Sequence, residues 1–325
     1  MDRTGRGKYW AMSHPHRVAI VGAGHVGATC AYALLLSGLT PEIVLIDKNH
    51  RRAEGEAMDL IHAVPFYDPV RIWAGGYDDV AGAAVVVIAA GGNQAPGETR
   101  LQLLARNAAV FRDVVPRVVQ RNPGGLLLVA TNPVDVLTYA SVRLSELSPS
   151  RVIGSGTILD TARFRALLSR HFGVEARSVH AYIVGEHGDS EVPVWSLATI
   201  GGMHLAEYQA ATGQTLDGEV KAEIFEKTRR AAYHIIERKG ATYYAVAAGV
   251  VRILRAILRD ESTVLTVSSL VSRYYGIDGV CLSLPCIVNR SGVARVLHPP
   301  LEGGEIEALQ RSAAVLREAQ HALDA

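Results

Sequence analysis

Four short polar segments of the sequence carry side chains that could do acid–base chemistry or bind a small anion. They cover residues 92–100, 131–135, 159–165 and 185–190. His187, in the last segment, is the candidate acid–base group because an imidazole titrates near neutral pH. An imidazole in that role needs a carboxylate that fixes its tautomer and stabilises its cation. Asp160 is one candidate. Asp189 is nearer in the sequence, although on a turn two residues away it need not face the ring.

Two arginines in the same segments could recognise a substrate carboxylate and polarise a carbonyl group. A planar, bidentate cation suits a carboxylate, which favours Arg over Lys. Arg163 lies three residues after Asp160, so both side chains would lie on the same face of one helix. Arg100 ends a segment that contains proline and glycine, which predicts a loop that closes over the substrate and excludes water. Together with His187, these residues suit the oxidation of a 2-hydroxy acid, in which a base takes the hydroxyl proton while hydride leaves the same carbon.

A glycine-rich turn near the start of the chain indicates where the hydride goes. The segment Gly22-Ala-Gly24-His25-Val26-Gly27 follows an apolar run and begins a helical stretch. In such a turn Gly22 permits a tight bend, Gly24 lets the backbone approach a pyrophosphate, and Gly27 lets the helix pack on the strand. The phosphates would lie on N–H groups at the helix N-terminus. Asp47 ends the next strand, where an acid binds the ribose hydroxyls and repels a 2′-phosphate, so NAD is favoured over NADP.

These segments need a scaffold that brings them together, and the alternation of strands and helices provides one. The first half predicts strands at 17–21, 42–46, 70–74, 84–90 and 125–130, with helices at 25–37, 49–63 and 101–120. This order predicts a parallel sheet covered by helices on both faces, with ligand-binding loops at the carboxyl ends of the strands. The second half predicts helices at 157–171, 218–238, 242–259 and 303–323, a strand at 178–184 and further strands between 263 and 296.

The predicted fold class is therefore α/β, with a doubly wound, NAD-binding Rossmann domain followed by an α+β substrate domain. We expect a disordered tail at residues 1–15, the Rossmann domain at 16–155 and the substrate/catalytic domain at 156–325. No linker rich in Pro, Gly or Ser separates the two domains, so we expect them to pack tightly and share a cleft.

Composition excludes several other classes of protein. The 325 residues are 49% hydrophobic and 20% charged, which is typical of a globular protein. The 33 Lys and Arg nearly balance the 32 Asp and Glu, which argues against nucleic-acid binding through bulk positive charge. No apolar run reaches the roughly 18–20 residues that span a membrane, and the polar first 16 residues do not resemble a secretory signal. The three cysteines form no CxxC pair, so we expect a reducing cytoplasm and no metal site.

The four polar segments and the glycine-rich turn together resemble those of the L-lactate/L-malate dehydrogenase family, and most closely those of bacterial L-lactate dehydrogenases. The resemblance runs from about residue 16 to the C-terminus, with the motifs in the family's order. It implies reversible hydride transfer between NADH and a 2-oxo acid, with His187 as proton donor and acceptor and Asp160 as its partner. Arg163 would bind the substrate carboxylate, and Arg100 would polarise the carbonyl group.

The resemblance also implies roles for residues around the cofactor. Asn132 would hold the nicotinamide ribose or the substrate oxygen, and the family forms a cis peptide at the bond to Pro133. Thr242 would lie near the substrate carboxylate, and Val246, one helical turn later, would press on the nicotinamide ring. The expected cofactor-binding residues are then Gly22, Gly24, His25, Val26, Gly27, Asp47, Gly91, Asn132 and Val246.

Gln94 is the residue that selects the substrate within this family. Malate dehydrogenases carry Arg at the matching position, where it pairs with the second carboxylate of oxaloacetate, whereas lactate dehydrogenases carry Gln. A neutral Gln94 leaves a second carboxylate without a counter-charge, which costs on the order of several kcal/mol. We therefore expect pyruvate and L-lactate as substrates, in the fermentation that follows glycolysis. Oxaloacetate or a longer 2-oxo acid is the alternative.

An effector site between subunits is also implied by the resemblance. Arg165 and His180 match positions that bind fructose 1,6-bisphosphate between two subunits in many bacterial lactate dehydrogenases. Cations that face one another across a two-fold axis suit phosphate, and a bound effector would stabilise one quaternary state. Otherwise Arg165 is a helix charge and His180 a strand residue in subunit packing. The family is usually tetrameric and sometimes dimeric, and we expect a homotetramer. The apolar faces at 58–62 and 241–257 are compatible with subunit contacts, although periodicity alone does not distinguish a subunit contact from the core.

Two functions from other classes are weaker alternatives. An NAD- and metal-dependent glycosidase on a related fold would need a Cys/His metal pair near the nicotinamide, and Cys30, Cys281 and Cys286 do not lie in such motifs. A non-catalytic NAD-binding protein would not need the acid, the base and both cations, all of which this sequence has. A substrate panel with NADH discriminates among these functions.

Overall fold

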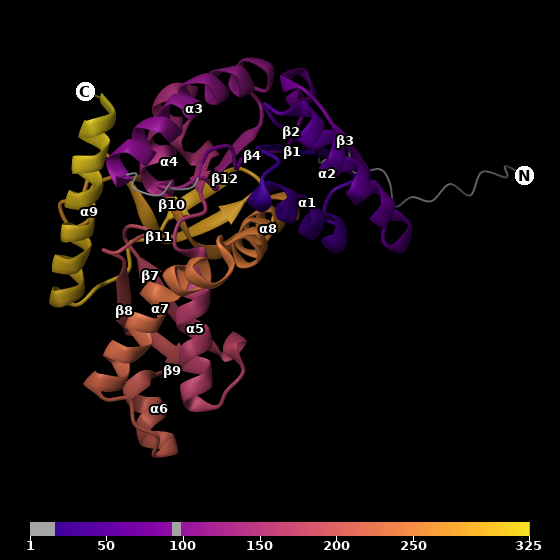
Figure 1. The fold of residues 1–325 in the computed structure, drawn as a ribbon. Coiled ribbons are helices and arrows are strands. Elements are labelled where there is room, and N and C mark those ends of the chain that lie inside the picture. The colour runs from indigo at the N-terminus through magenta and orange to yellow at the C-terminus, as the bar shows by residue number, and fades with distance from the viewer. Residues whose placement is uncertain (1–16, 93–98, 325) are drawn as a thin grey trace, which may run out of the picture.

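Six parallel strands form two thirds of a large sheet in the computed structural model, which describes residues 17–92 and 99–324 (Figure 1). They are β1 (Val18–Val21), β2 (Glu42–Ile46), β3 (Arg71–Ala74), β4 (Val85–Ile88), β5 (Leu126–Val129) and β6 (Val152–Gly154). Their order across the sheet is β3-β2-β1-β4-β5-β6, so the direction of winding reverses between β1 and β4. In sheets of this kind, ligands bind beyond the carboxyl ends of the strands at that point.

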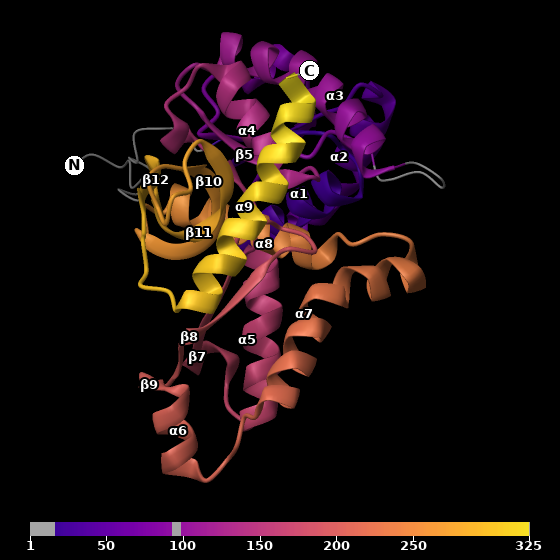
Figure 2. The same cartoon turned by 90° about the vertical axis from the view of Figure 1, so that its left-hand side faces the viewer.

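Helices cover both faces of these strands. The bounds are α1 (His25–Ser37), α2 (His50–Ala63), α3 (Arg100–Arg121), α4 (Val134–Ser145), α8 (Tyr244–Leu258) and α9 (Gly303–Asp324). One core packs α3, α4 and α9 on Val21 and Ile88, and the other packs α1, α2 and α8 on Ile20 and Val87 (Figure 2). Since neighbouring residues of a strand point to opposite faces, burial on both faces explains why these strands are apolar throughout.

The second half of the chain adds to this sheet and also builds a separate lobe. The antiparallel strands β10 (Thr263–Val271), β11 (Val280–Asn289) and β12 (Gly292–Val296) extend the sheet beside β6. The pair Ser268 and Gly154 joins β10 to β6. The lobe contains β7 (Val179–Val184), β8 (Val192–Ile200), β9 (Met203–His204), α5 (Ile158–Phe172), α6 (Leu205–Thr212) and α7 (Gly218–Lys239) (Figure 1). Phe164 and Ile183 belong to the core of this lobe.

The predicted parallel sheet with helices on both faces is confirmed, and the ends predicted for individual helices and strands lie within two residues of those observed. The sequence patterns did not indicate α4, β6, β8, β9 or α6, nor the short 3-10 helices Val64–Phe66, Tyr77–Val80, Pro149–Arg151 and Ala176–Ser178. In α4 the β-branched residues Val134, Val136 and Thr138 lower helix propensity, but all three are buried by tertiary packing. The expected tail at 1–15 lies outside the described residues.

Within the described ranges, no helix combines the length and the hydropathy needed to cross a membrane. The same residues contain no group of three or more His, Cys, Asp or Glu side chains arranged to hold a metal ion. All three cysteines are buried as free thiols.

Candidate active site

His187 lies in the turn that follows β7, and its ring is fixed by α5. Its Nδ1 lies 2.5 Å from Oδ2 of Asp160, a buried residue in the first turn of α5. Because the carboxylate accepts the Nδ1–H hydrogen bond, Nε2 is the ring nitrogen that remains for proton exchange with a substrate. Oδ1 of Asp160 accepts a hydrogen bond of 2.8 Å from Nη1 of Arg163, one helical turn later. The structure thus brings these three predicted side chains into one hydrogen-bonded group.

Burial and charge act in opposite directions on His187 and Asp160. Burial lowers the pKa of His187, but the negative charge of Asp160 and the hydrogen bond to it raise that pKa to about 9. Burial raises the pKa of Asp160, but the His187 cation, its hydrogen bond and the charge of Arg163 hold that pKa below its usual value. The two residues therefore form an imidazolium–carboxylate pair at neutral pH, which can donate a proton to a carbonyl oxygen.

Asp189, the alternative partner for the ring, contacts a different element. Its Oδ1 accepts a 2.8 Å hydrogen bond from the hydroxyl group of Tyr233 in α7. Its carbonyl oxygen accepts a longer hydrogen bond, 3.5 Å, from Nη1 of Arg229 in the same helix. Asp189 thus joins the turn to α7, and Asp160 is the acid that orients the imidazole.

Two buried carboxyl groups beside His187 were not assigned a role from the sequence. Asp135, in the first turn of α4, accepts a 2.7 Å hydrogen bond from the backbone N–H of His187. Burial raises the pKa of Asp135 to about 6. Burial, together with the charge of Asp160, raises the pKa of Glu191 to about 8. The available signal was position, because Asp135 ends one of the four polar segments and Glu191 directly follows another.

The turn after β5 is held by a side chain that the sequence did not single out. The peptide bond between Asn132 and Pro133 is cis, as expected. The carbonyl oxygen of Asn132 accepts a 2.8 Å hydrogen bond from Nδ2 of Asn107, a fully buried residue of α3. Asn107 also accepts a hydrogen bond from the N–H of Gly92 and donates one to its carbonyl oxygen. One amide therefore fixes Asn132 and the residue before the 93–98 segment relative to each other.

The three glycines of the turn between β1 and α1 differ in the space around their Cβ positions. A Cβ on Gly22, whose φ is +105°, would lie 2.5 Å from the backbone nitrogen of Ala90. A Cβ on Gly27 would lie only 1.8 Å from the carbonyl oxygen of Gly22, so both glycines are needed for backbone packing. In contrast, a Cβ on Gly24 would meet no atom within 4 Å. The open side of the turn is therefore at Gly24, where a pyrophosphate would approach.

The residues around this opening fit NAD. His25 and Val26 are the first residues of α1, so their N–H groups lie at a helix N-terminus that attracts phosphate. Asp47 follows β2 and accepts backbone hydrogen bonds of 2.8 Å from Ala23 and 2.9 Å from Asn49. These bonds hold its carboxylate beside the turn, and each oxygen retains a lone pair for a ribose hydroxyl. Gly91, with a φ of +155°, follows the neighbouring strand β4.

The start of α8 lies next to the same helix N-terminus. The ring of Tyr243, the N-cap residue of α8, has its centroid 5.2 Å from that of His25. Thr242 directly precedes Tyr243, and Val246 is in the first turn of α8; both are half-buried. The chain therefore brings these two predicted residues to the cofactor side of the molecule, although no hydrogen bond joins Thr242 to the His187 group among the described contacts.

The remaining predicted substrate residues belong to the segment that leads into α3. Gln94 lies outside the described residues, and Arg100 is described only through its backbone, as the first residue of α3. The side chain of Thr99 caps this helix by accepting a hydrogen bond of 3.2 Å from the N–H of Gln102.

The two predicted effector residues lie on neighbouring elements of the lower lobe. Arg165 is in α5 and His180 is exposed on β7. Nη2 of Arg165 donates a 3.2 Å hydrogen bond to the carbonyl oxygen of Ala176, whereas its buried Nε has no hydrogen-bond partner among the described residues. Burial lowers the pKa of Arg165, with Tyr182 acting in the opposite direction.

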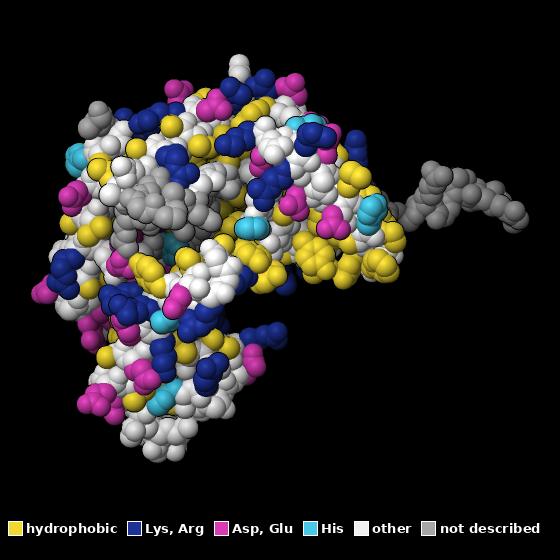
Figure 3. All heavy atoms as spheres, in the orientation of Figure 1, with side chains coloured by type: hydrophobic (Ala, Val, Ile, Leu, Met, Phe, Trp, Pro, Cys, Tyr) yellow, Lys and Arg dark blue, Asp and Glu magenta, His cyan; other side chains and the backbone are white. Residues whose placement is uncertain are grey.

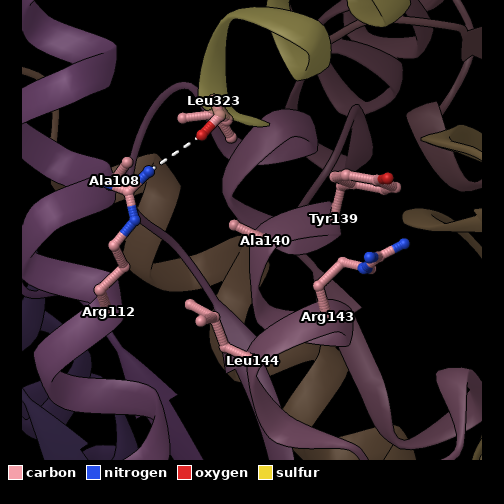
Figure 4. A pocket seen from close by; sticks show the side chains of 7 residues that line it. All are labelled: Ala108, Arg112, Tyr139, Ala140, Arg143, Leu144 and Leu323. Carbon is pink, nitrogen blue, oxygen red and sulfur yellow. Dashed lines mark hydrogen bonds between the residues drawn. The ribbon is translucent and has the colours of Figure 1, made fainter. Parts of the chain in front are cut away.

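A separate pocket lies between α3, α4 and the end of α9 (Figure 4). Its lining residues are Ala108, Arg112, Tyr139, Ala140, Arg143, Leu144 and Leu323. Nη2 of Arg112 donates a 2.9 Å hydrogen bond to the carbonyl oxygen of Leu323, which ties the end of α9 to α3. None of these residues belongs to the predicted catalytic or cofactor site.

Comparison with known families identifies both halves of the chain. Residues 16–154 match the model of the lactate/malate dehydrogenase NAD binding domain. Residues 157–323 match the model of the lactate/malate dehydrogenase alpha/beta C-terminal domain.

Individual relatives are similar over nearly the whole chain. An L-lactate dehydrogenase of Thermus aquaticus is 54% identical over 307 residues, which are 94% of this chain and 99% of that protein. An L-lactate dehydrogenase of Thermoanaerobacter pseudethanolicus is 49% identical over 309 residues, or 95% and 99% of the two chains. The solved minor L-lactate dehydrogenase of Enterococcus mundtii superposes with a TM-score of 0.91 at 40% identity, covering 94% of this chain and 98% of that one.

Proposed function

The chain belongs to the lactate/malate dehydrogenase family of NAD-dependent oxidoreductases, and we propose that it interconverts pyruvate and L-lactate. The observation that carries this proposal is the contact of His187 with Asp160, and of Asp160 with Arg163. It joins an acid–base imidazole, a partner carboxylate and a carboxylate-binding cation in one site. Relatives that are 49% and 54% identical and carry the name L-lactate dehydrogenase support the same substrate pair.

His187 is the proton donor in the proposed reduction. Bound NADH supplies the hydride that reduces the carbonyl carbon of pyruvate. Nε2–H of His187 donates its proton to the carbonyl oxygen, while Asp160 holds the ring through Nδ1 and stabilises its cation. In lactate oxidation the same nitrogen accepts the hydroxyl proton.

Two arginines are assigned to the substrate. Nη1 of Arg163 is bound to Asp160, and its other guanidinium N–H groups remain for the substrate carboxylate. Arg100 is proposed to polarise the carbonyl group, as the first residue of the helix that follows the 93–98 segment. Thr242 is proposed as a further contact of the carboxylate.

The cofactor would be held by residues from both halves of the chain. We assign the pyrophosphate to the N–H groups at Gly24, His25 and Val26, which lie on the open side of the glycine-rich turn. The adenosine ribose is assigned to Asp47, and the nicotinamide side to Gly91, Asn132 and Val246. The assignment of this last group rests on the family pattern and on the position of α8 beside α1.

Substrate choice is proposed to depend on Gln94, whose neutral amide leaves a second carboxylate unpaired. The test is NADH oxidation with pyruvate and, separately, with oxaloacetate. A preference of at least about tenfold in kcat/KM for pyruvate, which corresponds to ~1.4 kcal/mol, supports the assignment. A preference for oxaloacetate overturns it and moves the chain to the malate branch of the family.

We also propose activation by fructose 1,6-bisphosphate through Arg165 and His180. Nε of Arg165 is buried and has no hydrogen-bond partner in the part of the chain that the structure describes, and the ring of His180 is exposed on an adjacent element. Both groups can bind phosphate. The measurement is the rate at subsaturating pyruvate with and without the sugar bisphosphate. Stimulation that is lost on Arg165→Gln supports the site, whereas an unstimulated wild-type enzyme contradicts it.

A homotetramer is the proposed assembly. Large apolar side chains are exposed on α1, on α2 and in the segment 64–67 that follows it, namely Tyr32, Leu36, Met58, Ile61, Phe66 and Tyr67. Figure 3, in the orientation of Figure 1, shows hydrophobic side chains gathered along the lower edge of the part of the molecule that contains α1 and α2. An exposed patch of this kind is typical of a subunit interface. Sedimentation equilibrium measures the assembly directly, and a monomer at micromolar concentration contradicts it.

The cytoplasm is the proposed location. Cys30, Cys281 and Cys286 are buried free thiols, and burial raises the pKa of Cys30 and of Cys286 to about 12. Three unpaired thiols suit a reducing compartment. Fractionation of the native cells tests this location.

A further inference from the structure

Asp135 connects the acid–base residue to the cofactor side of the site. It lies two residues after the cis bond of Asn132 and Pro133, in the first turn of α4. Its Oδ2 accepts the backbone N–H of His187 over 2.7 Å, although the two residues are 52 positions apart. The segment 132–135 therefore contacts the turn that carries the proton donor and also contains the residue assigned to the nicotinamide ribose.

The two residues before His187 in the turn after β7 are held by β11 and α9. Gly185 exchanges two backbone hydrogen bonds of 2.9 Å with Ser283 of β11. The N–H of Glu186 donates a 2.8 Å hydrogen bond to the hydroxyl of Ser312 in α9. The next residue is His187, and Asp135 binds its backbone N–H directly.

The buried surroundings of Asp135 are unfavourable for an ionised carboxylate. It is 2% exposed, and its Oδ1 has no hydrogen-bond partner among the described residues. Burial without full hydrogen bonding is unfavourable for a carboxylate. The groups that face it are the turn residues His187 and Glu186, Ser268 of β10 and Cys281 of β11. His187 supplies the nearby positive charge that offsets this burial.

We propose that Asp135 is a positioning residue, which fixes the backbone of His187 relative to the cofactor and supports the charged form of its ring. The inference rests on the proposed function of His187. Asp160 holds the ring at Nδ1, but a single side-chain bond leaves the backbone of the turn able to shift. A displacement of about 1 Å between reacting groups can reduce a rate by roughly a hundredfold. The second contact, from α4, removes that freedom.

Two substitutions separate the contact from the charge. Asp135→Ala removes both the acceptor and the charge, so we expect kcat to fall about 30–100-fold, with KM for pyruvate and NADH affinity changed less than about threefold. Asp135→Asn retains a carbonyl oxygen that accepts the same N–H, so we expect it to recover kcat to within about fivefold of wild type. Ser141→Ala is the matched control, because it removes a buried hydroxyl of the same helix that donates to the carbonyl oxygen of Leu137 over 2.8 Å, and we expect kcat to be unchanged.

The effect of the Asp135 charge on the protonation of His187 is measured separately, through the reactivity of the His187 ring. Diethyl pyrocarbonate acylates neutral imidazole, and mass spectrometry of the peptide that contains His187 measures its rate without any substrate. The groups that face His187 are Asp160, Asp135 and Glu191. Loss of one negative charge lowers the fraction of imidazolium, so we expect Asp135→Asn to react at least about threefold faster at pH 7.5.

The outcomes distinguish this inference from the proposed function. Absence of pyruvate reduction by the wild-type protein contradicts the proposed function. The acylation rates of His187 in wild type and in Asp135→Asn then still test the role of Asp135. Folded Asp135→Ala enzyme with kcat within twofold of wild type overturns the positioning role. If Asp135→Ala does not fold, Asp135→Asn decides: wild-type acylation rate and an unchanged pH profile overturn the inference, and faster acylation with most of kcat retained supports it.

Discussion

The side chain of Asn107 and the carbonyl oxygen of Asn132 are joined by a 2.8 Å hydrogen bond that links α3 to the cis-peptide turn. Asn107 is fully buried and also exchanges two hydrogen bonds with the backbone of Gly92. Gly92 directly precedes the 93–98 segment, which lies outside the described residues. One amide therefore fixes Gly92 and the residue assigned to the nicotinamide ribose relative to each other.

Replacing Asn107 with Ala should weaken both the fold and the cofactor site. The substitution leaves the N–H of Gly92 and the carbonyl oxygen of Asn132 without their buried partner, at a cost of about 1–3 kcal/mol each. We expect a lower melting temperature and NADH affinity reduced by roughly tenfold, because the turn at Asn132 is no longer fixed. Thermal unfolding and NADH fluorescence titration measure the two effects.

Asn122→Ala is the matched control for this prediction. Asn122 is the C-cap residue of the same helix, is buried, and donates a hydrogen bond of 2.9 Å to the carbonyl oxygen of Ala83. Its loss should reduce the melting temperature and leave NADH affinity unchanged. Equal NADH affinity in the Asn107 and Asn122 variants would contradict a role of Asn107 in the site.

The pH dependence of the reaction should follow the raised pKa of His187. Pyruvate reduction needs the protonated ring, so its kcat/KM should be level near neutral pH and fall as the pH rises through about 9. Lactate oxidation needs the neutral ring and should rise up to that pH. In Asp160→Asn the negative charge that raises the pKa is lost, so both midpoints should move by more than one unit toward the ordinary histidine value of about 6.5.

Stopped-flow measurement of kcat/KM in both directions, from about pH 6 to about pH 10, tests this dependence. Asp189→Asn serves as the control, because Asp189 is nearer in sequence but bonds Tyr233 rather than the ring. Its midpoints should equal those of wild type. A shift in Asp189→Asn as large as that in Asp160→Asn would show that the assignment of the partner acid is wrong.

The sequence predicted the elements whose patterns are local. The apolar runs of β1, β2 and β4 and the glycine-rich turn are complete within a few residues, and the structure has them where they were expected. The hydrogen bond between Asp160 and His187 was also expected, although the residues are 27 positions apart. That expectation came from the chemistry that an imidazole needs, together with the family resemblance, and not from spacing.

The contacts that the sequence did not predict join residues far apart in the chain, and the residues that make them belong to no recognisable motif. Asn107 lies in the middle of a helix, where an asparagine usually faces solvent, and only the fold reveals that it holds Gly92 and Asn132. The helix α4 was missed because its β-branched residues suit a strand, and its burial by the sheet and by α9 is a tertiary effect. The hydrogen bond between Asp135 and the N–H of His187 was not predicted either, because it depends on how α4 packs against a turn 52 positions away.

The glycine-rich turn gives a contrast between two similar substitutions. Gly24 has an extended backbone and open space around its Cβ position, so Gly24→Ala should fold with a melting temperature close to wild type. A Cβ there would occupy the space assigned to the pyrophosphate, so NADH affinity should fall at least about tenfold. In Gly27→Ala the added Cβ would lie 1.8 Å from the carbonyl oxygen of Gly22, so the protein should be strongly destabilised.

Thermal unfolding and NADH titration of the two variants test this contrast. Wild-type NADH affinity in Gly24→Ala would show that the pyrophosphate does not approach this glycine. Wild-type stability in Gly27→Ala would show that α1 can move away from β1 at little cost, against the tight packing of this turn.

Glu191 should make stability fall as the pH rises. Burial and the charge of Asp160 raise its pKa to about 8, above the ordinary value of about 4.3. A carboxyl whose pKa is raised on folding binds its proton more tightly in the folded state, so the folded protein loses stability between the unfolded pKa and about pH 8.

Glu191→Gln removes this loss, so its melting temperature relative to wild type should be higher at pH 8.5 than at pH 5.5. The exposed substitution Glu318→Gln should show the same small difference at both pH values. An equal difference for Glu191→Gln at the two pH values would mean that this carboxyl ionises normally in the folded protein.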